Sequence, residues 1–339
     1  MGQNKGKDFC QIRTKAAGED DRGREGTTVS HGQSQMEEGE GGREDEPMTA
    51  RNFLGVCFTV ATVMAFYPVR AENKIPEEYK TGGFFIGCQA YTFNHFTVFE
   101  AIEKTAQTGG GVIEFYPGQK LSKEDPSVKW DHNASAETIQ KVQKKLAQHK
   151  IKAVNYGVVG IPREEAEARK VFEFAKKLGL RAVTTESVEA LDTIEKLVKE
   201  YDIMVGFHDH PRRPKDPNYR MWDPNYVLSL IKDRDARLGS CADTGHWVRS
   251  QLKPVECLRI LKGRIISSHL KDLNEMSPNA HDLPFGTGVS DIPAILEELK
   301  RQGFAGNLSI EYEYHWENSE PEVGQCIGFV RGYGQTKGW

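Results

Sequence analysis

The chain has 339 residues, with 45 Lys and Arg against 49 Asp and Glu, so its formal net charge is only −4. A balance this close to neutral excludes the strongly basic class of nucleic-acid-binding proteins. No apolar run reaches the roughly 18–20 residues of a membrane span, which argues against stable insertion in a bilayer. The length fits one large domain or two small ones.

Residues 1–47 have the composition of a segment without a core. They hold 9 glycines, 7 basic and 11 acidic residues, and almost no large apolar side chains. Such a segment cannot bury enough surface to offset the entropy lost on ordering. We therefore interpret residues 1–47 either as a disordered tail or as an over-extended translation start.

Residues 48–71 follow the layout of a secretory signal peptide. Met48 is followed by the basic Arg51, by the apolar run 53–66, and by Val69 and Ala71 at the −3 and −1 positions of a cleavage site. This pattern predicts that translation starts at Met48 and that the mature protein begins after Ala71. The predicted location is periplasmic or secreted.

Two kinds of sequence pattern, β-rich and helix-like, alternate from residue 84 onward. Short β-rich runs are 84–91, 111–116, 151–159, 181–187, 203–210, 238–243, 265–270 and 308–314, and amphipathic helix-like stretches are 135–150, 162–180, 188–201 and 290–304. Eight strands that alternate with helices over about 250 residues predict a parallel sheet of the size of a (β/α)₈ barrel. We therefore expect residues 72–339 to form a single α/β TIM barrel. A doubly wound open sheet is the alternative, but no G-x-G-x-x-G fingerprint follows the first strand.

Metal-ligand residue types gather where the later strands end, which is the functional face of such a barrel. The fifth run ends in His208 and His210, the sixth ends at Asp243, the seventh carries His269, and the eighth carries Glu311. A single His or Asp at a strand end is usually a cap, but four consecutive strands that all end this way predict one shared site. The most economical set is His208, Asp243, His269 and Glu311. Two imidazoles and two carboxylates suit Mn²⁺, Co²⁺, Zn²⁺ or Fe²⁺ better than Ca²⁺.

Four segments of the chain resemble the xylose isomerase-like TIM barrels. They are CADTGH (241–246), ISSHLKD (266–272), PFGTGVSDIPAILEELKRQGF (284–304) and LSIEYE (308–313). The superfamily includes sugar phosphate isomerase/epimerase-like proteins, tagatose/psicose-type 3-epimerases and endonuclease IV-type enzymes, and the resemblance covers about residues 84–333. It implies a divalent metal held by ligands from strands five to eight, with Asp243, His269 and Glu311 as three of them.

The chain departs from the epimerases at strand five. Those enzymes carry a Glu, both ligand and acid/base group, at the position that aligns with His208. A His can still bind the metal, but one of the paired bases is then missing. The candidates for the replacement are Glu186, Glu114, His210 and Lys271, of which Glu186 and Glu114 are favoured because cavity-facing carboxylates are costly unless used or paired. Each could instead have a purely structural role.

The reaction expected from these groups is proton abstraction next to the carbonyl of a keto-sugar. The metal would polarise the carbonyl and stabilise the enediolate, and a side chain would remove the proton. The function predicted is a metal-dependent sugar isomerase or epimerase, with a 3-keto-glycoside lyase or hydratase, or a non-catalytic sugar-binding barrel, as alternatives. Trp130, Trp222, Trp247 and Trp316 fall in predicted loops, where they could stack on a sugar ring.

The partner predicted is therefore a small carbohydrate. An endonuclease IV-like role is disfavoured by the neutral charge, by the signal peptide, and by too few candidate ligands for three metals. The oligomeric state stays open, a homo-oligomer included.

Overall fold

The computed structural model describes residues 75–339. The predicted tail 1–47 and signal peptide 48–71 lie outside the described residues. Within residues 75–339, no helix is both long enough and apolar enough to cross a bilayer.

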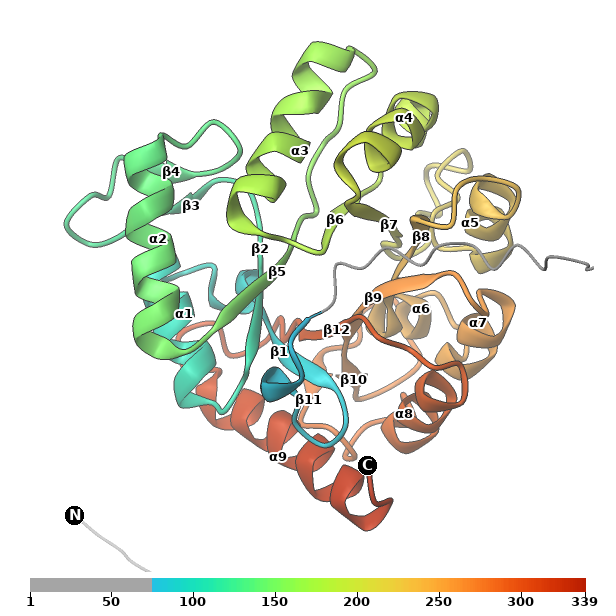
Figure 1. Ribbon diagram of the computed structural model, residues 1–339. Helices are drawn as coiled ribbons and strands as arrows, with labels where there is room; N and C mark the ends of the chain where they lie inside the picture. The colour runs from blue at the N-terminus through green and yellow to red at the C-terminus, as the bar shows by residue number, and fades with distance from the viewer. Residues whose placement is uncertain (1–74) are drawn as a thin grey trace, which may run out of the picture. The chain divides into compact units, whose positions relative to one another are not determined.

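The eight predicted strands form one closed parallel barrel, as expected (Figure 1). They are β1 (Phe85–Gln89), β2 (Val112–Phe115), β5 (Lys152–Tyr156), β6 (Ala182–Thr185), β7 (Met204–His208), β8 (Leu238–Asp243), β9 (Ile265–Leu270) and β12 (Asn307–Ile310). Their order around the barrel follows the chain, and β12 pairs with β1 to close it. Consecutive strands therefore bring their carboxyl ends together at one rim.

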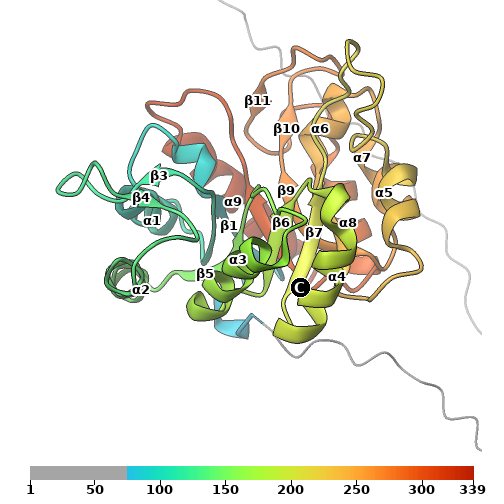
Figure 2. The same ribbon diagram turned by 90° about the horizontal axis from the view of Figure 1, so that it is seen from above.

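Helices follow the strands on the outside of the barrel. They are α1 (Val98–Gln107), α2 (Ala136–His149), α3 (Glu165–Leu178), α4 (Leu191–Tyr201), α5 (Pro224–Ile231), α6 (Thr244–Arg249), α7 (Pro254–Ile260), α8 (Ile292–Arg301) and α9 (Glu320–Thr336). Short 3₁₀ helices are η1 (Glu77–Tyr79), η2 (Ala90–Phe93) and η3 (Val188–Ala190). Two small hairpins complete the fold: β3 (Gln119–Lys120) with β4 (Lys129–Trp130), and β10 (Asp272–Leu273) with β11 (Asp282–Leu283). In Figure 2, β10, β11 and α6 lie together at the upper side of the barrel.

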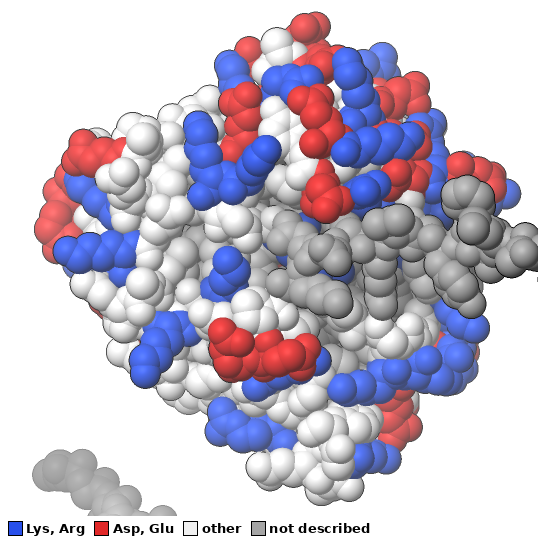
Figure 3. Space-filling view, in the orientation of Figure 1, with Lys and Arg blue, Asp and Glu red and all other residues white. Residues whose placement is uncertain are grey.

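The helices bury one apolar face and expose a charged one. In α2 the buried residues Ile139, Val142 and Leu146 recur at the spacing of one helix face, as the sequence predicts. On the face shown in Figure 3, basic and acidic side chains intermingle over α3 and α4. Glu165 pairs there with both Arg169 and Lys196. Exposed pairs of this kind each contribute only about 0–1 kcal/mol, so the buried faces dominate the stability of the helix layer.

Helix ends agree with the sequence in part. Ser135 accepts a hydrogen bond from Thr138 N as the N-cap of α2, and Gly179 ends α3 in the left-handed conformation with φ 64°. Two predicted starts are wrong. For the predicted stretch 162–180 the helix α3 begins only at Glu165, and for the stretch 290–304 the helix α8 begins at Ile292 with Asp291 as its N-cap.

The interior of the barrel carries a buried layer of polar side chains. Asn155 on β5 donates to Thr184 Oγ1 (2.9 Å) and to Ser267 Oγ (3.2 Å), so it links three strands. Ser309 on β12 donates to Glu114 on β2 over 2.7 Å. Buried polar groups are stable when they are hydrogen-bonded in this way. The layer leads upward to the ring of His, Asp and Glu side chains described next.

Candidate metal centre and active site

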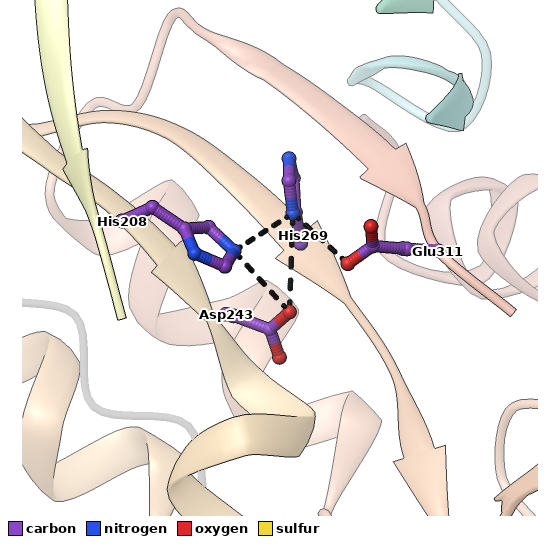
Figure 4. A group of neighbouring side chains, drawn as sticks. All are labelled: His208, Asp243, His269 and Glu311. Carbon is purple, nitrogen blue, oxygen red and sulfur yellow. Dashed lines mark hydrogen bonds and ion pairs between the residues drawn. The ribbon is translucent and has the colours of Figure 1, made fainter. Parts of the chain in front are cut away.

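Four side chains from four neighbouring strands converge at the carboxyl rim of the barrel (Figure 4). His208 and Asp243 are the last residues of β7 and β8, His269 lies near the end of β9, and Glu311 directly follows β12. All four are buried, and His269 and Asp243 have no exposed surface. The structure thus brings together the four residues that the sequence predicts as one metal-binding set.

The ligand atoms face a common point. Nε2 of His208 lies 3.1 Å from Nδ1 of His269 and 3.6 Å from Oδ2 of Asp243. Nδ1 of His269 lies 3.1 Å from Oε2 of Glu311 and 3.8 Å from Oδ2 of Asp243. Ligands bound at about 2.0–2.2 Å in tetrahedral or octahedral geometry are roughly 3.0–3.5 Å apart. The four residues therefore fit a divalent ion in spacing, and their mixed imidazole and carboxylate chemistry suits a first-row transition metal.

Lys271 supplies a positive charge beside these carboxylates. Its side chain is fully buried, and its Nζ lies 2.9 Å from Oδ2 of Asp243, 2.8 Å from Oε2 of Glu311 and 2.8 Å from Oε2 of Glu313. Burial lowers the pKa of Lys271, but the three carboxylates outweigh it and hold this pKa well above its usual value. Lys271 is therefore a charged partner of two candidate ligands.

The electrostatics keep the candidate ligand carboxylates ionised. Burial raises the pKa of Asp243 and of Glu311, but neighbouring cations, Lys271 among them, outweigh burial and hold both pKa values well below their usual range. Burial also lowers the pKa of His208. Its contacts with Asp243 and Glu186 prevail and raise that pKa to about 10. Two anionic oxygens thus face the common point, as a cation site requires.

Glu114 lies beneath the ring rather than in the cavity. It has no exposed surface and accepts hydrogen bonds from Thr184 Oγ1 (3.1 Å) and Ser309 Oγ (2.7 Å). Its Oε1 also lies 3.2 Å from Nε2 of His269, whose Nδ1 belongs to the ring above. A carboxylate beside the far nitrogen of a metal-binding His can orient the ring, although the Glu114 contact is not aligned as a hydrogen bond. This environment differs from the cavity-facing one expected for a base.

Glu186 and His210 form a pair at the edge of the ring. Oε1 of Glu186 contacts Nδ1 of His210 and accepts a hydrogen bond from the hydroxyl of Tyr219 (2.8 Å). Burial raises the pKa of Glu186, but hydrogen bonds with His208 and His210 outweigh it and lower this pKa overall. The side chain of His210 is 39% exposed. A half-exposed imidazole with one nitrogen held by a carboxylate has the layout of a general acid/base group.

A cavity of about 300 Å³ opens directly above the ring. It is lined by Gln89, Tyr91, Tyr116, Pro117, Val158, His208, His210, His246, Glu311 and Glu313. His208, His210 and Glu311 are the predicted site residues that reach it, whereas Glu114, Glu186 and Lys271 do not line it.

His246 and Glu313 reach the cavity but were not nominated from the sequence. His246 stacks on His210 with ring centroids 5.0 Å apart, and burial holds its pKa well below the usual value, so its ring is neutral. Glu313 accepts from Lys271 and from Arg249 Nη1 (2.9 Å). Two sequence patterns indicate these residues. His246 lies three positions after Asp243, and Glu313 lies two positions after Glu311, on the same face of the predicted strand.

Local backbone structure explains the D-T-G-H sequence. Asp243 caps α6, with its Oδ1 accepting from His246 N at 2.7 Å, and this fixes the carboxylate so that Oδ2 points to the common point. A Cβ on Gly245 would lie 2.7 Å from two carbons of the Lys271 side chain. Gly245 therefore leaves room for Lys271 to pass under the helix.

Comparison with known proteins agrees with this geometry. A family model described as xylose isomerase-like TIM barrel matches residues 102–333. No curated protein matches the chain. Among solved structures, a putative uncharacterized protein from Parabacteroides distasonis is 32% identical, with a TM-score of 0.59 over 74% of this chain and 98% of that one.

Two more distant structures share the fold. D-psicose 3-epimerase with D-tagatose from Clostridium cellulolyticum is 13% identical, with a TM-score of 0.56 over 74% of this chain and 99% of that one. A probable 3-DHS dehydratase involved in petrobactin synthesis from Bacillus anthracis is also 13% identical, with a TM-score of 0.53 over 73% of this chain and 98% of that one. On the family model and the 32% identical structure, this chain belongs to the xylose isomerase-like TIM barrel family.

Proposed function

We propose that this protein is a divalent-metal-dependent enzyme that isomerises or epimerises a keto-sugar. The observation that carries the proposal is the convergence of His208, Asp243, His269 and Glu311 at a cavity that His210, held by Glu186, also lines. Membership of a family whose solved structures include a sugar 3-epimerase supports a sugar as substrate. The metals that fit the donor set are Mn²⁺, Co²⁺, Zn²⁺ and Fe²⁺.

The metal, held by these four residues, would polarise the substrate carbonyl and stabilise the enediolate that forms on proton loss. His210 is the side chain best placed to take the proton, because it borders the cavity and Glu186 holds its Nδ1. Glu186 then stabilises the imidazolium that results. Return of the proton by His210 to the neighbouring carbon gives an isomer, whereas an epimer requires a second group that protonates the same carbon on its other face.

Glu313 and His246 would position the substrate. Lys271 and Arg249 hold Glu313 at the cavity edge, where its carboxylate can accept a hydrogen bond from a sugar hydroxyl. Arg249 Nη1 donates to Nδ1 of His246, so the neutral ring can donate one from Nε2. Both groups border the space in which a hydroxylated ring would lie.

A lyase or hydratase acting on a 3-keto-glycoside is the second candidate. It is favoured by His208, which stands where the related epimerases carry an acid/base Glu, so the site has a single evident base on that side. One base suffices when the carbanion expels a β-leaving group instead of being reprotonated. The likeness to a protein named as a dehydratase agrees with this option.

Solvent-deuterium exchange on keto-sugars, followed by NMR identification of the products, tests the proposal. Metal-dependent exchange with recovery of an isomer supports the first candidate, and loss of the glycosidic substituent supports the second. Protein that binds no metal and gives no exchange favours the non-catalytic sugar-binding barrel. We also propose that residues 48–71 direct export, which N-terminal sequencing of the exported protein tests; a mature chain beginning before Met48 refutes it.

A further inference from the structure

An aromatic rim borders the cavity above the ring on the side away from His210. We define the rim as Tyr91 in η2, Tyr116 after β2, and Trp316 and His95 in the loops beside them. Tyr91 meets Tyr116 edge to face at 5.2 Å and Trp316 edge to face at 5.9 Å between ring centroids. His95 stacks on Trp316 at 5.9 Å. These contacts hold the four rings in fixed relative positions.

The rim joins three cavities. The central cavity of about 300 Å³ includes Tyr91 and Tyr116 in its wall. Tyr116 and His95 both line a second cavity of about 640 Å³, and His95 and Trp316 both line a third of about 710 Å³. Ligand cavities are typically about 300–1,000 Å³, so the central one is sized for a single small unit and the flanking ones can hold another. A ligand that fills the central cavity can extend across the rim.

The chemistry of the rim indicates the kind of ligand. Tyr91 is 38% exposed, so part of its ring is open to a ligand. Planar rings suit the C–H faces of a sugar, and they bind with little loss of side-chain entropy. The flanking cavities differ in charge, since Lys120, Lys123 and Lys129 with Glu100 line the second, whereas Glu317 and Glu322 line the third. The third cavity, which Trp316 also lines, therefore favours a neutral, hydroxylated ligand over a phosphate or a uronate.

We infer that the aromatic rim is a subsite for a second sugar unit, so that the substrate is a glycoside rather than a free monosaccharide. The inference rests on the proposed function in that the first unit occupies the cavity above His208 and Glu311. Among the tryptophans expected to stack on sugar, Trp316 alone lies in this rim. Trp130 and Trp247 are instead buried in the core, and Trp222 packs against Arg212.

Calorimetric titration tests the subsite without requiring turnover. The probes are cellobiose, maltose, lactose and mannobiose, compared with the methyl glycosides of their monosaccharides. We expect at least one disaccharide to bind about tenfold more tightly than the matching methyl glycoside. Tyr91→Ala and Trp316→Ala should reduce that affinity to the methyl-glycoside level, while Tyr91→Phe retains it. Tyr226→Ala, on α5 and outside all three cavities, is the matched control and should leave it unchanged.

Two results overturn the inference. One is that no disaccharide binds more tightly than its methyl glycoside. The other is that tighter binding persists in both alanine variants, with folding verified by thermal melting. Since binding is measured with unoxidised sugars, a failure of the proton-exchange assay would refute the proposed function and leave this result standing.

Discussion

Nε2 of His208 and Nδ1 of His269 face each other across 3.1 Å, and both imidazoles are buried. Two ring nitrogens at this distance must either share a proton or bind a common cation. Asp243 Oδ2 lies 3.6 Å and 3.8 Å from the same two nitrogens, so a cation between them would also meet an anionic oxygen. This relationship makes the ring of four a candidate metal centre.

The first prediction concerns the ligands themselves. His269→Ala and Glu311→Ala should each lower the affinity for Mn²⁺, Co²⁺ or Zn²⁺ by more than about 100-fold, which exceeds the usual cost of losing an outer-shell partner. Metal content after dialysis, measured by mass spectrometry, gives the result. His149→Ala, at the end of α2, is a control that should retain metal. Full metal occupancy in both ligand variants would show that His269 and Glu311 do not bind the metal.

The second prediction concerns Glu114. Its contact with Nε2 of His269 should orient the ring, so Glu114→Gln should weaken metal binding by about 10–100-fold without abolishing it. Competition with a chromogenic chelator measures the affinity. Glu298→Gln removes a carboxylate that is equally buried but belongs to α8, and it should leave metal affinity unchanged. If Glu114→Gln binds metal as tightly as the parent protein, Glu114 does not orient His269.

The third prediction separates catalysis from metal binding. His210→Ala should slow solvent-proton exchange by about 10²–10⁴-fold while metal is retained, because the acid/base group is lost and the four ligands remain. Glu186→Gln should slow it less, since the imidazole stays but its Nδ1 loses an ionised partner. NMR measurement of the exchange rate, together with the metal content of each variant, tests this prediction. An unchanged exchange rate in His210→Ala would show that another group removes the proton.

The fourth prediction is a pH dependence of stability that does not involve the site. Hydrogen bonds from Arg301 and Gln302 lower the pKa of Glu298 to about 2, against about 4.3 in an unfolded chain. Because the folded pKa is the lower one, the stabilisation is complete above about pH 5 and is lost as the pH falls toward 2. Glu298→Gln should therefore lower the free energy of unfolding by about 1–2 kcal/mol at pH 7.

Urea denaturation at pH 7, 4 and 2.5 measures this difference. It should shrink as the pH falls, because the carboxyl of the unfolded chain has the higher pKa and is protonated first, so ionisation favours the folded state less and less. A difference that stays constant across the three pH values would mean that the charge of Glu298 contributes nothing.

The barrel could be predicted from sequence because its strands and several helices carry strong local patterns. All eight strands lie within the predicted runs or start one residue away, and α2 shows its apolar face directly. Helix α9 was not predicted. It contains Gly324, Gly328 and Gly332, which disfavour a helix locally, and packing of its buried Val323 and Ile327 against the barrel outweighs that preference.

The sequence predicts which residues meet at the site, but not how far along the barrel axis each of them lies. Period-two alternation in β-strands tells which side chains face inward, and strand order tells which ends are neighbours. The height of each residue depends on the register between strands, which the sequence does not reveal. Glu114 is fully buried and does not line the cavity, although it pairs in register with Gln89, which does. Glu186, one residue past β6, contacts His210 in the cavity wall. The same limit hid the contribution of His246, which α6 places over the ring.

The most direct test of the central claim is proton exchange in D₂O with a panel of 3-keto-glycosides and free ketoses, using protein loaded with Mn²⁺, Co²⁺, Zn²⁺ or Fe²⁺. The account predicts metal-dependent loss of the proton signal next to the carbonyl, accompanied by isomer or elimination product, and absent in His269→Ala. Metal-loaded protein that exchanges no proton on any member of the panel would contradict it.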